Sequence, residues 1–183
     1  MKQNQVNFLL AAILIFAAAI SRVILYPNNY SPIIGMALFG GAIIRDKRFA
    51  FVLPIFAMFI SDVMFEASGI AKGFWGWGQL LGYAILAIIT VFGFKLKKVN
   101  AVNVIGFSLV SSSIFFVLSN LSFFLIDNKI YHTYSNNLDG LKNCFIQALP
   151  FFKAHIDLAF SSILFGTYYI ITTYAIANKR VTV

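Results

Sequence analysis

Long apolar runs separated by short polar connections constrain this chain more than any other feature of its sequence. A helix needs about 20 apolar residues to cross the hydrocarbon core of a bilayer. Five runs approach or exceed that length: 8–26, 49–65, 79–94, 104–126 and 154–177. A shorter run, 33–44, follows Ser31 and Pro32, which are favoured at the cap and first turn of a helix. The sequence predicts an all-α integral membrane protein with six transmembrane helices.

Composition supports this class and excludes others. Charged residues make up 11% of the chain, against about 25% in soluble domains. The formal net charge is +8, but the positive residues sit in short clusters between apolar runs, so we expect no nucleic-acid partner. A lone cysteine, Cys144, excludes an intrachain disulfide. No linker or repeat divides the chain, which predicts a single transmembrane domain over 1–183.

The distribution of lysine and arginine predicts the orientation, because short cytoplasmic loops are enriched in both. With six helices, one side receives Lys2, Arg45, Lys47, Arg48, Lys95, Lys97, Lys98, Lys179 and Arg180. The other side receives Lys72, Lys129, Lys142 and Lys153. Both termini are therefore expected in the cytoplasm, with the lipid bilayer surrounding the helices.

A cleaved signal peptide is the alternative for the N-terminal run. The alanines at 17–19 resemble a cleavage site after an apolar stretch. However, the preceding segment has a single lysine, and the apolar pattern resumes directly after the alanines. A first transmembrane helix is the favoured interpretation.

The strongly polar residues near or within the predicted spans all fall in the outer third of the membrane under this topology. They are Arg22, Asp62, Gln79, Asn120, His155 and Asp157. Simple structural roles exist for several of them. Arg22 and Asp157 suit the dipoles of their helix ends, while His155 and Gln79 suit an interfacial position.

Asp62 is harder to explain as a surface residue. It lies near the carboxyl end of its predicted helix, where the dipole disfavours an anion, and facing lipid would cost about 2.5–3.5 kcal/mol. We expect Asp62 to pair with Arg22, with Asn120 nearby as a neutral hydrogen-bonding partner. Such a pair suits either a structural link between helices or a binding site.

The outer connections contain candidate ligand contacts. Asn29 and Tyr30 lie in "PNNYSP", and Trp75 and Trp77 lie in "GFWGWG". These aromatic residues suit the interfacial belt of a membrane protein, or loops that fold over a ligand. The long connection 127–153 contains apolar residues at helical spacing, which predicts a surface helix acting as an interfacial anchor or as a lid.

Motifs for common enzymes are missing. The sequence has no phosphate-binding glycine loop ending in Lys-Ser/Thr, no H-E-x-x-H and no G-x-S-x-G. We therefore expect no enzymatic activity, no cofactor and no metal site. In addition, His155 and Asp157 are two residues apart, which turns a helix by about 200 degrees and places them on different faces.

Several motifs resemble a known family. "YSPIIGMALFGGA", "ISD", "LSN" and "ALPFFKAHIDLAFSSILFG" are similar to a family of uncharacterised bacterial membrane proteins assigned to transport. This similarity implies a location in the inner membrane of a bacterium. Six helices in under 200 residues, both termini inside, a short second helix after "NNYSP" and polar groups under the outer loops also resemble the S component, the substrate-binding subunit of energy-coupling factor transporters. That resemblance implies capture of a small, vitamin-like molecule from outside, a separate transmembrane coupling subunit and ATPase subunits.

One feature departs from the S-component pattern, which commonly has an Ala-x-x-x-Ala surface on the first helix. Here the first run offers only Ala17 and Ser21 at that spacing. Ala37 and Gly41 form another small pair that permits close helix packing. We expect a solute-binding transport subunit. The alternatives are an autonomous ion-coupled permease, a membrane enzyme, or an assembly protein without a ligand.

Overall fold

The computed structural model describes residues 3–26, 30–74 and 76–181, and every regular element in these ranges is a helix. The helices are α1 (Gln3–Ile24), α2 (Ile33–Ile43), α3 (Lys47–Ser68), α4 (Trp77–Gly93), α5 (Ala101–Ser122), α6 (Asn128–Tyr131), α7 (Leu138–Ala148) and α8 (Ala154–Val181). A π-helical turn, η2 (Phe123–Asp127), joins α5 to α6, and a 3₁₀ turn, η3 (Leu149–Phe151), follows α7.

Four helical segments are long and apolar enough to cross a membrane: Asn4–Ile24, Lys47–Ser68, Ala101–Tyr131 and Ala154–Tyr174. The third of them continues from α5 through η2 and α6. These segments agree with a helical membrane protein. The remaining apolar helices, α2 and α4, are shorter, and the 11 residues of α2 extend only about 16 Å.

The short helix α2 is the centre of the bundle. It packs against α1, α3, α4, α5 and α8, and eight of its eleven residues are buried. Its amino-terminal end is covered by protein, since Ile34, Gly35 and Met36 are buried, as its short length required. Gly41 permits the closest approach, because a Cβ atom there would lie 2.2 Å from the Thr90 carbonyl oxygen of α4. The prediction of close packing at Ala37 and Gly41 is confirmed, since Ala37 is also fully buried.

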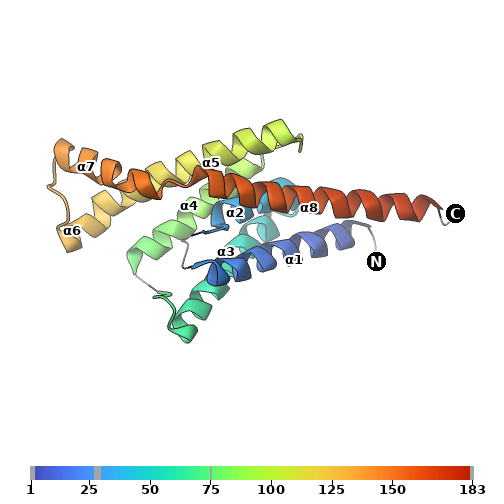
Figure 1. Ribbon diagram of the computed structural model, residues 1–183, viewed down its shortest axis with the longest axis horizontal. Coiled ribbons are helices and arrows are strands. Elements are labelled where there is room, and N and C mark those ends of the chain that lie inside the picture. Colours follow the sequence, from blue (N-terminus) through green and yellow to red (C-terminus); the bar gives the residue numbers. More distant parts are fainter. Residues whose placement is uncertain (1–2, 27–29, 75, 182–183) are drawn as a thin grey trace.

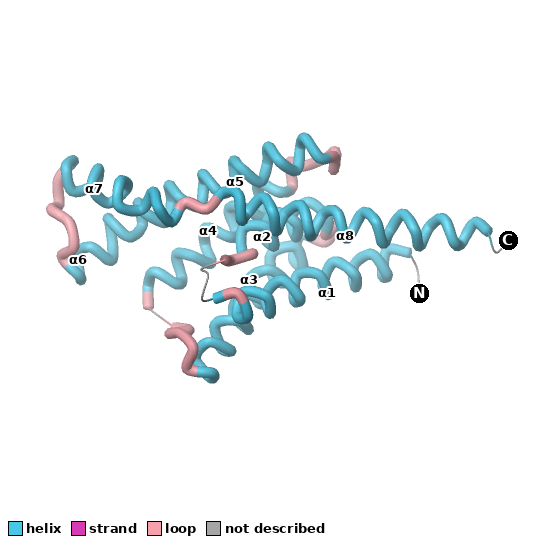
Figure 2. The backbone as a smooth tube through the Cα atoms, in the orientation of Figure 1, coloured by secondary structure: helices cyan, strands magenta, loops and turns pink. Residues whose placement is uncertain are grey.

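The two termini lie at the same end of the molecule, and α6 and α7 lie at the opposite end (Figure 1). We call these the terminal end and the cap end. The connections 44–46 and 94–100 lie toward the terminal end, and the connections before α2, before α4 and around α6 lie toward the cap end (Figure 2). Basic residues Arg45, Lys47 and Arg48 therefore share the terminal end with Lys95, Lys97 and Lys98.

The predicted surface helix in the long connection is α7. Asn137 caps its start by accepting a hydrogen bond from the Gly140 amide. The apolar face of α7 lies on α5, where the Phe145 ring meets Phe116 at 5.8 Å and the buried Cys144 thiol donates to the Asn120 carbonyl. This face therefore contacts protein, and the segment after it leads directly over the cap end of the bundle.

Candidate functional site

The predicted pair between Arg22 and Asp62 is present. A guanidinium nitrogen of Arg22 lies 2.5 Å from one carboxylate oxygen of Asp62 and also donates to the Ser61 hydroxyl. The Asp62 side chain is 1% exposed. The Arg22 guanidinium also stacks 5.0 Å above the Phe65 ring. The arginine thus joins α1 to α3 and neutralises the buried acid, as the position of Asp62 in its helix required.

The second oxygen of Asp62 is held by α4. Gln79 donates to it at 2.8 Å and the Tyr83 hydroxyl donates at 2.7 Å. Gln79 also donates to the Gly73 carbonyl, so it fixes the connection before α4 as well. Gln79 is buried and does not face the headgroups. We call Arg22, Ser61, Asp62, Gln79 and Tyr83 the Asp62 network.

Asn120 is not part of the Asp62 network, so this part of the sequence prediction is wrong. Its amide donates to the Phe116 carbonyl of its own helix at 2.7 Å, a common local hydrogen bond for a short polar side chain. The neutral partners of the pair come from α3 and α4. Tyr83 was missed, although it lies four residues after Gln79 and therefore on the same helix face.

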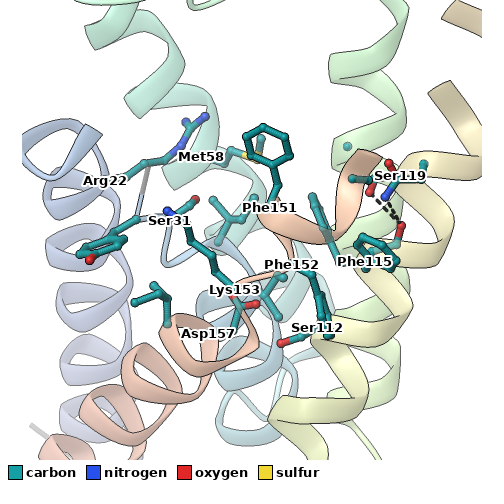
Figure 3. Close-up of a pocket in the computed structure, with 18 of the residues that line it drawn as sticks. Arg22, Ser31, Met58, Ser112, Phe115, Ser119, Phe151, Phe152, Lys153 and Asp157 are labelled. Atoms are coloured by element: carbon teal, nitrogen blue, oxygen red, sulfur yellow. Dashed lines mark hydrogen bonds between the residues drawn. The ribbon is translucent and has the colours of Figure 1, made fainter. Parts of the chain in front are cut away.

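A cavity of about 420 Å³ lies on the other side of Arg22, toward the cap end (Figure 3). It is enclosed by residues of α1 to α5, the end of α7, η3 and the start of α8. Its polar lining consists of Arg22, Ser31, Ser112, Ser119, Asn120, Lys153 and Asp157, and its aromatic lining consists of Tyr26, Tyr30, Phe115, Phe116, Phe151 and Phe152. The mixture of flat apolar walls and a few polar groups is typical of small-molecule sites.

Asp157 is the acidic group of this cavity. In the view of Figure 3 it lies at the lower edge with Ser112, while Arg22 lies at the upper edge. The Ser112 hydroxyl lines the cavity beside it and donates to the Ser108 carbonyl of its own helix at 3.0 Å. Within the described residues, no lysine, arginine or histidine forms an ion pair with it, because the one ion pair there joins Arg22 and Asp62. The dipole of α8 contributes about 0.3–1 kcal/mol to a carboxylate in its first turn, less than burial of a charge costs.

Lys153 is the second cation that lines the cavity, and it lies just before α8. Its ammonium group lies 5.2 Å from the centre of the Tyr30 ring. The neighbouring Phe152 packs on Phe116 with ring centres 4.9 Å apart. The segment after α7 therefore contacts Tyr30, in the connection before α2, and Phe116 of α5, which both line the cavity.

The structure brings together four of the predicted site residues as cavity lining: Arg22, Tyr30, Asn120 and Asp157. Asp62 and Gln79 support Arg22 from behind. Two others do not line the cavity. Trp77 is 67% exposed, and His155 is exposed because it lies on another face of α8 than Asp157. Asn29 and Trp75 fall outside the described residues.

Most of the cavity wall contributed by α5 was missed. Ser112, Phe115, Phe116, Ser119 and Asn120 recur at helical spacing and line one face of the helix. The signal is present in the sequence as a stripe that mixes small polar and aromatic residues. It is weak because serine and phenylalanine are both common in transmembrane helices. In the described residues no group of three His, Cys, Asp or Glu side chains is placed to hold a metal ion.

Comparison with known families places the chain. Residues 2–179 match the model described as "Family of unknown function (DUF6580)". The chain belongs to this family. The DUF6580 region includes the Asp62 network and the whole cavity lining. No curated protein and no solved structure matches the chain.

Proposed function

We propose that this protein is a substrate-binding subunit for membrane transport, which captures a small, vitamin-like molecule at the cap end of the bundle. The observation that carries the proposal is the cavity of about 420 Å³, lined by both aromatic and polar side chains. Ligand sites of small molecules are commonly about 300–1,000 Å³ and combine an apolar wall with a few convergent polar groups. A purely structural bundle has no use for such a space, because apolar contacts are lost around it.

The proposed topology has six passes, with α2 and α4 crossing together with the four longer segments. The terminal end then faces the cytoplasm, because its two connections and the first two residues of α3 together contain six of the lysine and arginine residues. The cap end faces outward, in the position where a capture site for an external solute belongs.

The Asp62 network supports a preformed site. It ties α1, α3 and α4 together directly behind Arg22, through hydrogen bonds of 2.5–3.0 Å. Three further side chains, Ser61, Gln79 and Tyr83, hold the guanidinium and the carboxylate in place, so Arg22 presents a fixed edge to the cavity. A ligand that binds this rigid wall loses little affinity, because few protein side chains must become ordered on binding.

Release of the molecule toward the cytoplasm needs a rearrangement. Ile15, Leu38, Phe39 and Ile89 are fully buried and fill the bundle between the cavity and the terminal end. A transmembrane coupling subunit with ATPase subunits is the proposed source of that rearrangement, as the resemblance to S components suggests. An autonomous carrier is the second candidate, favoured by the two carboxylates within the helices.

The test uses two glycines that differ in one respect. A Cβ atom at Gly82 or at Gly106 meets nothing within 4 Å, so both accept a side chain, but only Gly82 lines the cavity. Replacing either glycine with leucine raises helix propensity by a similar amount, about 1 kcal/mol. Gly82→Leu inserts a side chain at the cavity wall, and Gly106→Leu is the matched control.

Native mass spectrometry of the protein, gently solubilised from its own host, records both retained small molecules and bound subunits. We expect a retained metabolite in the unsubstituted protein and in Gly106→Leu, and its loss in Gly82→Leu. Equal retention by the two variants, or no retained molecule in any of the three proteins, would contradict ligand capture in this cavity. Copurifying ATPase subunits would support the energised mechanism over the autonomous carrier.

A further inference from the structure

The charged side chains around the cavity differ in whether another group of the protein neutralises them. Arg22 faces it, but its charge is already neutralised by the Asp62 carboxylate at 2.5 Å. Lys153 also lines the cavity, with its ammonium group 5.2 Å from the centre of the Tyr30 ring. Asp157 faces the cavity with a hydroxyl as its neighbour and without an ion-pair partner among the described residues. The acid is therefore the cavity group whose charge the protein leaves unmatched.

The surroundings of Asp157 specify the rest of the ligand. Phe115, Phe116 and Phe152 lie along the same cavity, with the rings of Phe116 and Phe152 4.9 Å apart and inclined by 50°. Aromatic walls favour a flat ring system through offset and edge-to-face contacts. The faces of such rings also attract a cation, which adds to the effect of the carboxylate.

We propose that the cavity selects a small aromatic molecule carrying a protonated nitrogen, and that Asp157 accepts the hydrogen bond from that nitrogen. This inference rests on the proposed function, because it names the class of molecule that the same cavity captures. An anionic analogue would bring a second negative charge to Asp157, and a neutral analogue would forgo the ion pair.

Lys153 is the competitor for this role. It lies four residues before Asp157, and the Asp157 amide donates to its carbonyl at 3.3 Å. If the Lys153 side chain rotated from the Tyr30 ring toward Asp157, its ammonium group would neutralise the Asp157 carboxylate without a ligand. Removing the ammonium group with Lys153→Gln then strengthens binding of a cationic ligand, whereas a lysine that binds the ligand directly would weaken it.

The experiment measures equilibrium binding of three indoles to the full chain in detergent. Tryptamine carries an ammonium group, indole-3-propionate a carboxylate and indole-3-ethanol a neutral hydroxyl on the same ring. We expect tryptamine to bind about tenfold or more tightly than either analogue. Asp157→Asn removes this preference, and Asp139→Asn retains it, because Asp139 is an exposed acid of α7 outside the cavity lining.

The order of the three indole affinities for the unsubstituted protein tests the inference even if a variant does not fold. Preference for the propionate, or a tryptamine preference that persists in Asp157→Asn, would overturn the inference while leaving small-molecule capture intact. Absence of binding by all three probes at millimolar concentration would also overturn it. The Gly82→Leu and Gly106→Leu pair then decides separately whether the proposed function fails as well.

Discussion

Two carboxylates lie inside apolar helices near the cap end, and they differ in what surrounds them. Asp62 of α3 is 1% exposed and accepts hydrogen bonds from Arg22, Gln79 and Tyr83. Asp157 of α8 faces a cavity, beside Ser112 and aromatic rings. Both acids have the same carboxylate chemistry. Asp62 has its hydrogen-bonding capacity filled by the protein, and Asp157 does not.

This difference distinguishes an acid with a structural role, Asp62, from a candidate ligand-binding acid, Asp157. An intramembrane acid is costly, so an acid is expected either to be matched internally or to be matched by something that binds. Asp62 meets the first condition and links three helices. We propose that Asp157 meets the second, because it faces the cavity. The following predictions test this division, beginning with the largest effect.

Removing the cation from the Asp62 network should cost the most. Arg22→Met leaves the Asp62 carboxylate buried without its partner and should lower the free energy of unfolding by about 3–5 kcal/mol. Thermal unfolding in detergent measures the loss. The double variant Arg22→Met with Asp62→Leu should recover most of it, because the unpaired charge is then absent. A single variant as stable as the unsubstituted protein would remove the distinction between the two acids.

Removing neutral donors from Asp62 should cost less. Gln79→Leu deletes the hydrogen bonds to Asp62 and to the Gly73 carbonyl, and we expect a loss of about 1–3 kcal/mol. Tyr83→Phe deletes one donor and should cost about 1 kcal/mol. The same unfolding measurement orders the two variants. A larger loss for Tyr83→Phe than for Gln79→Leu would mean that the hydroxyl, and not the amide, is the main neutral support.

Neutralising the cavity acid should change stability little. Asp157→Asn keeps the shape of the side chain while removing an unmatched charge, so the free energy of unfolding should change by less than about 1 kcal/mol. The variant should instead lose the tryptamine preference. Destabilisation as large as that of Arg22→Met would show that Asp157 is matched within the fold after all.

The smallest expected effect concerns α7, the helix that precedes the cavity-lining segment 151–153. Burial raises the pKa of the Cys144 thiol on α7, so less thiolate is present at neutral pH than in the unfolded chain. Maleimide labelling should be slow at pH 7 and faster as the pH rises toward the raised pKa. Asp157→Asn should leave this rate unchanged. Fast labelling at pH 7 in the folded protein would indicate that α7 does not rest on α5.

The sequence was sufficient for the helices and for the principal ion pair, because both follow from the cost of placing polar groups in hydrocarbon. Apolar runs must form helices in a bilayer, and an acid at the wrong end of a helix must find a cation, which left Arg22 as the partner of Asp62. The alternation of Lys-rich and Lys-poor connections followed from the same helix order. In the proposed topology, both α2 and α4 cross the membrane.

The walls of the cavity could not be predicted from the sequence, because they depend on how the helices pack in three dimensions. Asn120 was expected at the ion pair because its depth matched, but depth alone does not fix the direction in which a helix face points. The same limit applies to Trp77, which stands exposed at the start of α4. The phenylalanines of α5 carry no charge to distinguish them from lipid-facing residues. Only the packing of α5 against α7 and α8 turns that stripe inward.

The most direct test of the account is an experimental structure of the protein purified from its own membranes without added ligand. The account predicts a bound small molecule in the cavity between Arg22 and Asp157, with a nitrogen at hydrogen-bonding distance from the Asp157 carboxylate and the Arg22 to Asp62 pair unchanged. A molecule that instead replaces Arg22 at Asp62, or a cavity filled by its own side chains with Lys153 on Asp157, would contradict it.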